Sequence, residues 1–250
     1  MIKNSFQHED ITINGVLVQS SSKDVLNAVC YADLECVILD MQHGFWSLNE
    51  LESFMTRCGI NSANKIAPFV RTPINPSIST IGSIMDAGAW GLVIPFVETA
   101  EELEEIRKWS MYPPTGVRSL ARCSGLVNTG LNIEDYISWT KHNTIIIAIV
   151  ETPKGLDNLK QIIEQSDGVL FGIRDLCLIT GNTQIRMIEE IEVILDDITE
   201  PNEVRFGFLG VTLNYLKRNR PTFNIIGSIR DLLINSINTT VKLTQRNDHK

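Results

Sequence analysis

Short apolar runs recur along the chain, and segments with helical periodicity separate them. Eight such runs occupy residues 15–19, 36–41, 66–70, 91–97, 144–150, 167–172, 205–210 and 223–227. Each run is apolar almost throughout and does not alternate with polar positions, which is typical of parallel strands that are buried on both faces. The pattern therefore predicts eight buried parallel strands.

Amphipathic segments follow these runs and predict helices. They occupy residues 23–32, 47–58, 75–88, 99–109, 155–165, 183–198, 212–218 and 228–243. Two of them begin with the three-residue spacing of a capping box, Ser47 with Glu50 and Thr99 with Glu102. The connection over residues 112–132 is interpreted as a long βα loop after the fourth strand, and residues 244–250 as a frayed tail.

Eight strands that alternate with eight helices favour an α/β fold of the (β/α)₈ barrel type. An open doubly wound sheet shows the same alternation, but the chain has no glycine-rich dinucleotide fingerprint after its first strand. Eight repeats in 250 residues also fit a barrel. We therefore expect one barrel domain over residues 1–250, with an ordered core from about residue 11 to residue 242.

Composition and charge narrow the class of protein. The hydrophobic fraction is 43% and the charged fraction 21%, as in ordinary globular proteins. A net charge of −8 with scattered basic residues argues against nucleic acid and membrane-surface partners. The N-terminus lacks the apolar segment of a secretory signal, residues 145–150 are too short to span a bilayer, and the five cysteines form no CxxC pair. These features predict a cytoplasmic protein with reduced thiols.

Polar residues follow several of the predicted strands. Because the active site of a barrel lies where the strand C-termini open into the βα loops, these residues are the candidates for chemistry. The set is Asp40 and His43 after the second strand, Arg71 after the third, Glu151 after the fifth and Asp175 after the sixth. Bringing these charged groups together would cost on the order of several kcal/mol of folding free energy, because their charges repel and lose solvation. A bound cation or substrate could offset that cost.

Each of these residues also has a structural interpretation. A single acid at a strand end is commonly a helix cap or a salt-bridge partner. Glu98, just before a predicted helix, fits that interpretation best, and Asp175 could cap a helix that starts at Leu176. A single histidine is more often structural than catalytic, and Arg71 could simply hold a loop. It is the set as a whole that favours function.

The residue types suggest one chemistry. Two carboxylates, Glu151 and Asp175, form an all-oxygen site that suits a divalent metal cation, Mg²⁺ or Mn²⁺, with Co²⁺ as a further possibility. Arg71 on the same rim can hold a carboxylate or stabilise an oxyanion. Asp40 could orient the imidazole of His43 or act through a water. Metal, arginine and base together serve enolate formation next to a carbonyl.

Six segments of the chain, in order, resemble the HpcH/HpaI aldolase/citrate lyase family, in particular its metal-dependent class II pyruvate aldolases. The segments are "ILDMQHG", "FVRTP", "MDAGAWGLVIPFVETAEE", "YPPTGVRS", "IVETPKGLDNL" and "GVLFGIRDL". The resemblance implies a metal bound by Glu151 and Asp175, and an Arg71 that holds the pyruvyl oxygen. It also implies that His43 is the acid/base, with Asp40 assisting it.

The resemblance has further implications for substrate binding and assembly. Main-chain amides from Gly172 to Asp175 would bind the carboxylate of a 2-oxo acid. Family members form hexamers by exchanging or packing C-terminal helices, which implies a homo-oligomer, and an acid at the position of Asp86 can reach a neighbour's site.

Three departures from the family pattern bear on the substrate. "GIRD" replaces the usual "GPxD" or "GTxD", which puts Ile173 and Arg174 beside the substrate amides. The extra cation could select a second carboxylate or a phosphate, or it could point outward. Gln42 replaces an acid, and the segment 176–190 is shorter than usual.

The predicted function is a lyase that cleaves a 4-hydroxy-2-oxo acid to pyruvate and an aldehyde. The same enolate would also serve an oxaloacetate decarboxylase, which needs the metal and Arg71 but no base at an aldehyde-bearing carbon. A sugar-phosphate barrel is a further alternative, from the glycines after the last two strands, which could also simply form tight βα turns. A pseudoenzyme that binds a keto acid is the alternative without catalysis.

Overall fold

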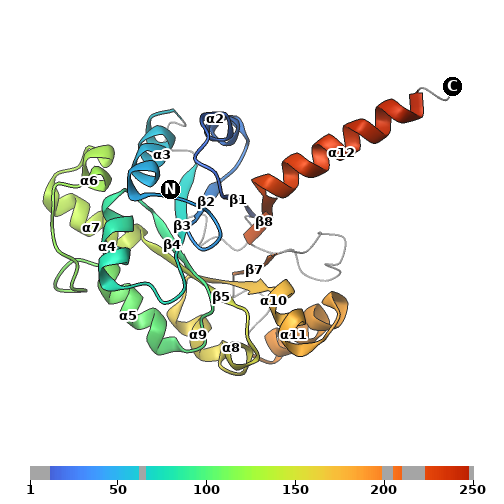
Figure 1. The fold of residues 1–250 in the computed structure, drawn as a ribbon. Coiled ribbons are helices and arrows are strands. Elements are labelled where there is room, and N and C mark those ends of the chain that lie inside the picture. The colour runs from blue at the N-terminus through green and yellow to red at the C-terminus, as the bar shows by residue number, and fades with distance from the viewer. Residues whose placement is uncertain (1–11, 62–65, 199–204, 210–222, 248–250) are drawn as a thin grey trace.

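The structure, a computed structural model, describes residues 12–61, 66–198, 205–209 and 223–247. Eight parallel strands form one sheet in the order β7-β6-β5-β4-β3-β2-β1-β8. β7 and β8, at the two ends of that order, also contact each other, so the sheet nearly closes into a barrel that helices surround (Figure 1). The strands are β1 Ile13–Val18, β2 Cys36–Asp40, β3 Ala67–Arg71, β4 Gly91–Ile94, β5 Ile145–Val150, β6 Gly168–Gly172, β7 Phe206–Leu209 and β8 Phe223–Ser228. The predicted (β/α)₈ fold is confirmed.

Helices connect the strands. They are α2 Lys23–Tyr31, α3 Leu48–Asn61, α4 Ile78–Asp86, α5 Ala100–Ser110, α6 Ser124–Thr129, α7 Ile133–Asn143, α8 Pro153–Asp157, α9 Leu159–Gln165, α10 Ile173–Thr180, α11 Gln184–Ile198 and α12 Ile229–Asn247. The helix predicted over residues 212–218 lies outside the described residues. Within the part of the chain that is described, each helix is too short or too polar to cross a bilayer.

The strands are buried on both faces, as their continuous apolar runs predict. Alternate side chains fill the barrel interior, among them Ile38, Phe69 and Ile147. The side chains between them, such as Leu39 and Ala148, pack outward against the helices. Gly207 of β7 lets β8 come close, because a Cβ atom there would collide with the carbonyl oxygen of Phe223. The two apolar layers therefore fix which strand residues face the barrel axis.

The long connection after β4 differs from the prediction. Residues 112–132 follow α5 and not β4, so they leave the end of the barrel where strands begin. They also contain α6, and α7 follows directly. The first turn of α7 is capped by the side chain of Asn132, which accepts a hydrogen bond from the amide of Asp135 at 2.8 Å. The segment is thus an αβ connection with two helices, remote from the strand C-termini.

Of the two predicted capping boxes, the one at Ser47 is present and the one at Thr99 is not. Ser47 and Glu50 form a reciprocal capping box, with Ser47 N to Glu50 Oε2 at 2.9 Å and Glu50 N to Ser47 Oγ at 3.3 Å. Thr99 precedes α5 but its side chain makes no cap hydrogen bond. Glu102 accepts instead from the amide of Glu98 at 3.2 Å, one residue earlier than a capping box requires.

α12 leaves the barrel wall. It contacts β1 and β8 near its start and then projects away from the other helices, as Figure 1 shows. It runs to Asn247, beyond the predicted end at residue 243, so most of the expected frayed tail is helical. Five apolar side chains on it are about half exposed or more, namely Leu233, Ile234, Ile237, Val241 and Leu243. Among the described residues no element covers this apolar surface of α12, and such a surface is typical of an interaction site.

Candidate active site

The inward-facing series of the strands ends in polar residues at one end of the barrel. In β2 the series Cys36, Ile38 continues to Asp40, and in β3 Phe69 is followed by Arg71. In β5 the same alternation leads from Ile149 to Glu151. Because alternate residues of a strand face the same way, these side chains form a polar layer over the apolar interior. This polar layer, defined here as Asp40, Arg71 and Glu151, lies at the strand C-termini.

Arg71 and Asp40 form a buried ion pair within this layer. They are register partners on neighbouring strands. Arg71 donates from Nε to Asp40 Oδ1 at 2.9 Å and from Nη2 to Oδ2 at 2.7 Å. Asp40 is fully buried and Arg71 is 7% exposed. Such bidentate geometry fixes the plane of the guanidinium group.

The same carboxylate also holds the turn that follows β2. The amides of Gln42 and His43 both donate to Asp40 Oδ1 at 3.1 Å, and Gln19 Nε2 donates to Oδ2 at 3.1 Å. Gly44 fits this turn because a Cβ atom there would collide with the carbonyl oxygen of Asp40. Burial alone would raise the pKa of Asp40, but Arg71, the amide of His43 and Gln19 together hold that pKa below its ordinary value.

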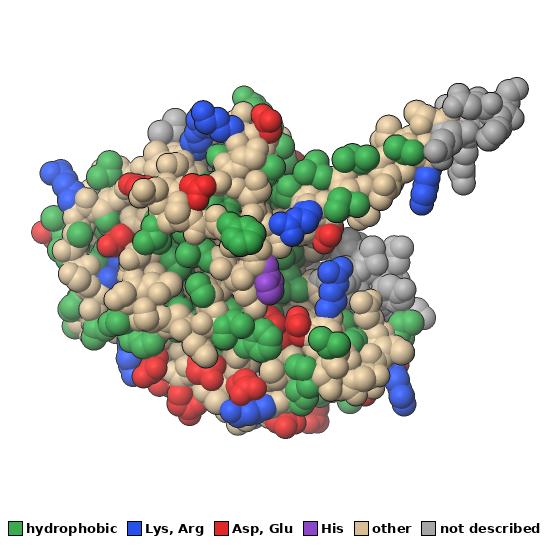
Figure 2. Space-filling model, viewed as in Figure 1, with side chains coloured by type: hydrophobic (Ala, Val, Ile, Leu, Met, Phe, Trp, Pro, Cys, Tyr) green, Lys and Arg blue, Asp and Glu red, His purple; other side chains and the backbone are tan. Residues whose placement is uncertain are grey.

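His43 is exposed to solvent on this turn. Among the described residues its bond to Asp40 is made through the main-chain amide, and no hydrogen bond joins the carboxylate to the imidazole. The structure therefore brings the two residues together but shows Asp40 orienting the backbone of His43, not its ring. In the view of Figure 2, a histidine with acidic and basic side chains nearby lies near the centre of the molecule.

Glu151 and Asp175 lie close enough for their charges to interact. Glu151 follows β5 and is 3% exposed. Burial raises its pKa to about 7, the charge of Asp175 adds to the rise, and Arg71 opposes it. Asp175 is the third residue of α10, which starts at Ile173, so the alternative of Asp175 as the cap of a helix starting at Leu176 is wrong. A carboxylate with a pKa this high lacks full compensation by nearby cations.

These two carboxylates fit a divalent cation. Both supply hard oxygen donors, and the raised pKa of Glu151 shows that its negative charge is under-compensated where it lies. Gly172 leaves room for that side chain, since a Cβ atom there would lie 2.6 Å from Cγ and 3.0 Å from Cδ of Glu151. Among the described residues no group of three or more His, Cys, Asp or Glu could hold a metal. Water and substrate would have to complete the coordination.

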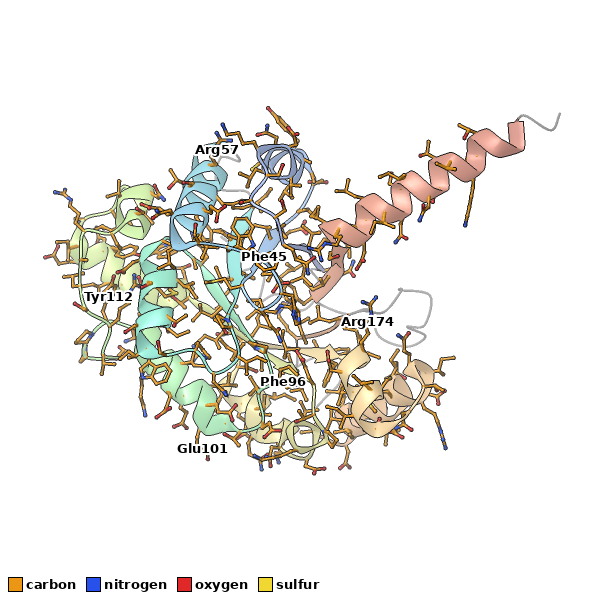
Figure 3. The ribbon with its side chains drawn as sticks, viewed as in Figure 1. Phe45, Arg57, Phe96, Glu101, Tyr112 and Arg174 are labelled. Carbon is orange, nitrogen blue, oxygen red and sulfur yellow. The ribbon has the colours of Figure 1, made fainter. Side chains whose placement is uncertain are left out.

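The altered loop after β6 forms the first turn of α10. Gly172 is its N-terminal flanking residue, Ile173 is buried and Arg174 is exposed. The first amides of a helix have no partner within it, so those from Ile173 to Asp175 are free to bind an anion. Figure 3 shows Arg174 at the start of α10, with Phe45 and Phe96 on the same face of the molecule.

Asp86 is not part of this site. It is the last residue of α4, at the end of the barrel where β4 begins, opposite to the strand C-termini. Its carboxylate accepts from Nη2 of Arg118 at 2.6 Å, and Arg118 is itself buried against the ring of Tyr112. The structure thus separates Asp86 from the other predicted site residues of the same chain.

Two residues near the site escaped the sequence analysis. Gln19 follows β1 and binds Asp40, and the alternation Gly15, Leu17, Gln19 would have identified it as facing inward. Phe96 has a φ of 55°, which is rare for a bulky residue. This backbone turn ends β4 at Ile94, three residues before the end predicted at residue 97.

Glu98 has the structural role that was predicted for it. Its side chain accepts from Thr152 Oγ1 and from Lys154 Nζ, both at 2.9 Å. It therefore ties the loop after β4 to the start of α8. These hydrogen bonds from Lys154 and Thr152 lower the pKa of Glu98.

Comparisons with known proteins identify relatives of this chain. The family description "HpcH/HpaI aldolase/citrate lyase" matches residues 14–200. The chain is 30% identical over 169 residues to a hydroxypyruvate/pyruvate aldolase of Rhizorhabdus wittichii, covering 67% of this chain and 64% of that protein. It is 31% identical over 153 residues to a 5-keto-4-deoxy-D-glucarate aldolase of Escherichia coli, covering 60% of this chain and 58% of that protein. These matches thus span about three fifths of the relatives' length.

A solved structure gives the same picture of the fold. The HpcH/HpaI aldolase/citrate lyase family protein of Burkholderia cenocepacia superposes with a TM-score of 0.84 at 17% identity, covering 98% of both chains. At this identity the likeness concerns the fold alone.

Proposed function

The chain belongs to the HpcH/HpaI aldolase/citrate lyase family, and from this premise we propose that it is a metal-dependent carbon–carbon lyase. Its substrate would be a 4-hydroxy-2-oxo acid and its products pyruvate and an aldehyde. The observation that carries the proposal is the polar layer, in which a buried carboxylate fixes Arg71 near a second, under-compensated carboxylate, Glu151. The names of the two aldolase relatives support the same class of reaction.

Cleavage breaks one carbon–carbon bond and involves two proton transfers, one from the C4 hydroxyl and one to C3. The C4 hydroxyl loses its proton, the C3–C4 bond breaks, and its electrons form the enolate of pyruvate while C4 leaves as an aldehyde carbonyl. Protonation of C3 then gives pyruvate. We assign the removal of the hydroxyl proton to His43, because its exposed ring can exchange protons with both substrate and water.

Arg71 and the first turn of α10 would position the 2-oxo acid. Asp40 occupies Nε of Arg71 and one N–H of Nη2, which leaves Nη1 and the other Nη2 N–H for the 2-oxo oxygen. The amides from Gly172 to Asp175 would donate hydrogen bonds to the carboxylate of the substrate. A divalent cation, held by Glu151 and Asp175, would polarise the 2-oxo group and offset negative charge on it.

The test is pyruvate release from a series of 4-hydroxy-2-oxo acids by EDTA-treated protein, with and without added Mg²⁺, Mn²⁺ or Co²⁺. Release that depends on the cation is expected, and full activity in EDTA would refute metal dependence. His43→Ala should lower kcat about 10²- to 10⁴-fold. The control is Lys141→Gln, an exposed change just before β5, at the opposite end of the barrel.

Oxaloacetate separates the lyase from the decarboxylase. Decarboxylation uses the same enolate but no base at C4, so His43→Ala should spare it while abolishing aldol cleavage. Turnover of oxaloacetate alone would favour the decarboxylase. Binding of pyruvate without turnover of any substrate would favour the pseudoenzyme.

We also propose that the chain forms a homo-oligomer through α12. The exposed apolar residues Leu233, Ile234, Ile237 and Val241 have the spacing of one helical stripe. A second copy of the chain is the occupant proposed for this stripe, and the hexamer implied by the family resemblance is the expected size.

We also propose a cytoplasmic location and a single-domain organisation. The described cysteines Cys36, Cys123 and Cys177 carry free thiols, which suits a reducing cytoplasm. One domain over residues 1–250 agrees with the single barrel, whose strands come from both ends of the chain.

A further inference from the structure

The side chain of Arg174 lies at the start of α10 and has no role in the proposed reaction, which uses the main-chain amides of this turn and the carboxylate of Asp175. On the assumption that the proposed function holds, we propose that Arg174 selects substrates with a second anionic group at the end remote from the 2-oxo acid. A carboxylate and a phosphate share the chemistry that a guanidinium group recognises. Arg174 is thus a specificity-determining residue, and the aldehyde product would carry the anion.

The placement of Arg174 follows from the start of α10. β6 ends at Gly172 and α10 begins at the next residue, so the first turn of the helix lies at the polar layer. Successive residues of a helix are about 100° apart. Ile173 is buried, Asp175 is half-buried with its charge felt by Glu151, and Arg174 is exposed between them. Figure 3 shows Arg174 at the start of α10.

Nothing in the described part of the chain accounts for the charge of Arg174. No described acid forms an ion pair with it, and no hydrogen bond between it and a described residue is present. In the first turn of a helix a cation is also opposed by the helix dipole. Lys154, second in α8 as Arg174 is second in α10, does have a partner, Glu98 at 2.9 Å. Arg174 is therefore available to a ligand.

The charges of the site leave one positive charge at its rim. Asp40 and Arg71 neutralise each other in their ion pair. Glu151 and Asp175 together match one divalent cation. A 2-oxo acid brings one carboxylate, which the helix amides bind, so Arg174 still has no ion-pair partner among the described residues. A second anionic group on the substrate would supply that partner, because a guanidinium group binds carboxylate or phosphate through paired N–H donors.

The first test measures binding without turnover. Two 2-oxo acids of equal length that lack the 4-hydroxyl group, 2-oxoheptanedioate and 2-oxoheptanoate, differ in one terminal carboxylate. Titration calorimetry of the Mn²⁺-loaded protein should show the dianion binding about tenfold or more tightly. Arg174→Gln should remove that preference and leave the affinity for the monoanion within about twofold. Arg174→Lys should keep part of it, because the charge remains without the paired donors.

The second test measures cleavage. For 4-hydroxy-2-oxo acids with a terminal carboxylate, Arg174→Gln should lower kcat/KM about tenfold or more, chiefly through KM. For substrates with an uncharged end it should change little, and Lys141→Gln should affect neither. A series ending in phosphate separates the two anions, since the larger loss identifies the preferred group.

The outcomes distinguish the inference from the proposed function. Equal binding of dianion and monoanion by the unaltered protein, or a preference that survives Arg174→Gln, would overturn the role of Arg174 while leaving the lyase intact. Failure to bind or cleave any 2-oxo acid with any cation would overturn the proposed function and this inference with it.

Discussion

Asp40 Oδ1 accepts two hydrogen bonds, one from Nε of Arg71 at 2.9 Å and one from the main-chain amide of His43 at 3.1 Å. One buried oxygen thus joins the strand that carries the proposed substrate-binding arginine to the turn that carries the proposed base. Because the two elements share an acceptor, the position of each depends on the other.

Replacement of Asp40 by Asn should destabilise the fold and misplace Arg71. Removing one partner of a buried pair leaves the other charge without compensation, which costs about 3 kcal/mol or more. Urea unfolding at pH 7 measures this loss. In the double variant Asp40→Asn, Arg71→Met the unpaired charge is gone, so the combined loss should be smaller than the sum of the two single losses. Additive losses would show that the pair is not coupled.

Stability of the cation-free protein should fall as pH rises from about 4.5 to about 7. The pKa of Glu151 is raised to about 7 in the folded state, from an ordinary value of 4.5, so the folded protein holds this proton more tightly than the unfolded chain. The contribution is fully present below the ordinary pKa and is lost as pH rises through the folded-state pKa, by about 3 kcal/mol. Urea unfolding in EDTA from pH 4.5 to 8 measures it.

The variant Glu151→Gln is the control for this titration. It cannot ionise, so the pH dependence assigned to Glu151 should vanish, whereas Glu104→Gln, on the exposed face of α5, should retain it. A slope that persists in Glu151→Gln would assign the titration to another group.

The affinity for a divalent cation should rise with pH as Glu151 loses its proton, whereas stability falls over the same range. A ligand carboxylate must be ionised, so Mn²⁺ should bind about tenfold more weakly at pH 6 than at pH 8. Calorimetry at the two pH values tests this. Asp175→Asn should weaken binding at both, and an affinity independent of pH would argue that Glu151 is not a ligand.

Gly172→Ala should disturb Glu151 without unfolding the barrel. A Cβ atom at this position would lie 2.6 Å from Cγ of Glu151, so the carboxylate must move. We expect weaker Mn²⁺ binding and at least about tenfold lower kcat/KM, with unfolding still cooperative. The matched control is Gly82→Ala in α4, where a Cβ atom meets nothing within 4 Å. It should be neutral or stabilise the helix by up to about 1 kcal/mol.

Ile237→Glu should weaken the proposed assembly. Ile237 lies within the apolar stripe of α12 and is 61% exposed in the single chain. Burying a charge there should lower the association constant at least about a hundredfold, seen as a smaller mass in light scattering. Thr239→Glu is the control, because positions two apart on a helix point about 200° apart. An unchanged mass for Ile237→Glu would exclude this surface.

The strands could be predicted because β2, β5 and their neighbours are buried on both faces. Nearly every position in such a strand is apolar, so the strand is visible in the sequence as an unbroken apolar run. Asp40, Arg71 and Glu151 could be predicted for the same reason, as polar residues that end such runs. The roles within the layer could not be, since the pairing of Asp40 with Arg71 depends on the register of β2 and β3. The residues at the end of a strand do not reveal which residue of the neighbouring strand lies beside them.

Helices outside the simple repeat were harder to predict. α7 has only Tyr136 and Thr140 fully buried, so its apolar stripe is narrow, and its strongest signal was the cap at Asn132. The start of α10 was missed because Ile173 and Arg174 were read as loop residues. Its apolar first residue is explained by packing against the barrel, not by helix propensity.

The shared acceptor also has a consequence for how this protein can diverge. Any substitution at Asp40 alters two of the proposed site positions at once, so an evolving lineage would have to compensate for both changes. Arg174 belongs to no such network among the described residues. If Arg174 has the proposed role, single substitutions there would change substrate preference, whereas a change at Asp40 would need compensating changes elsewhere.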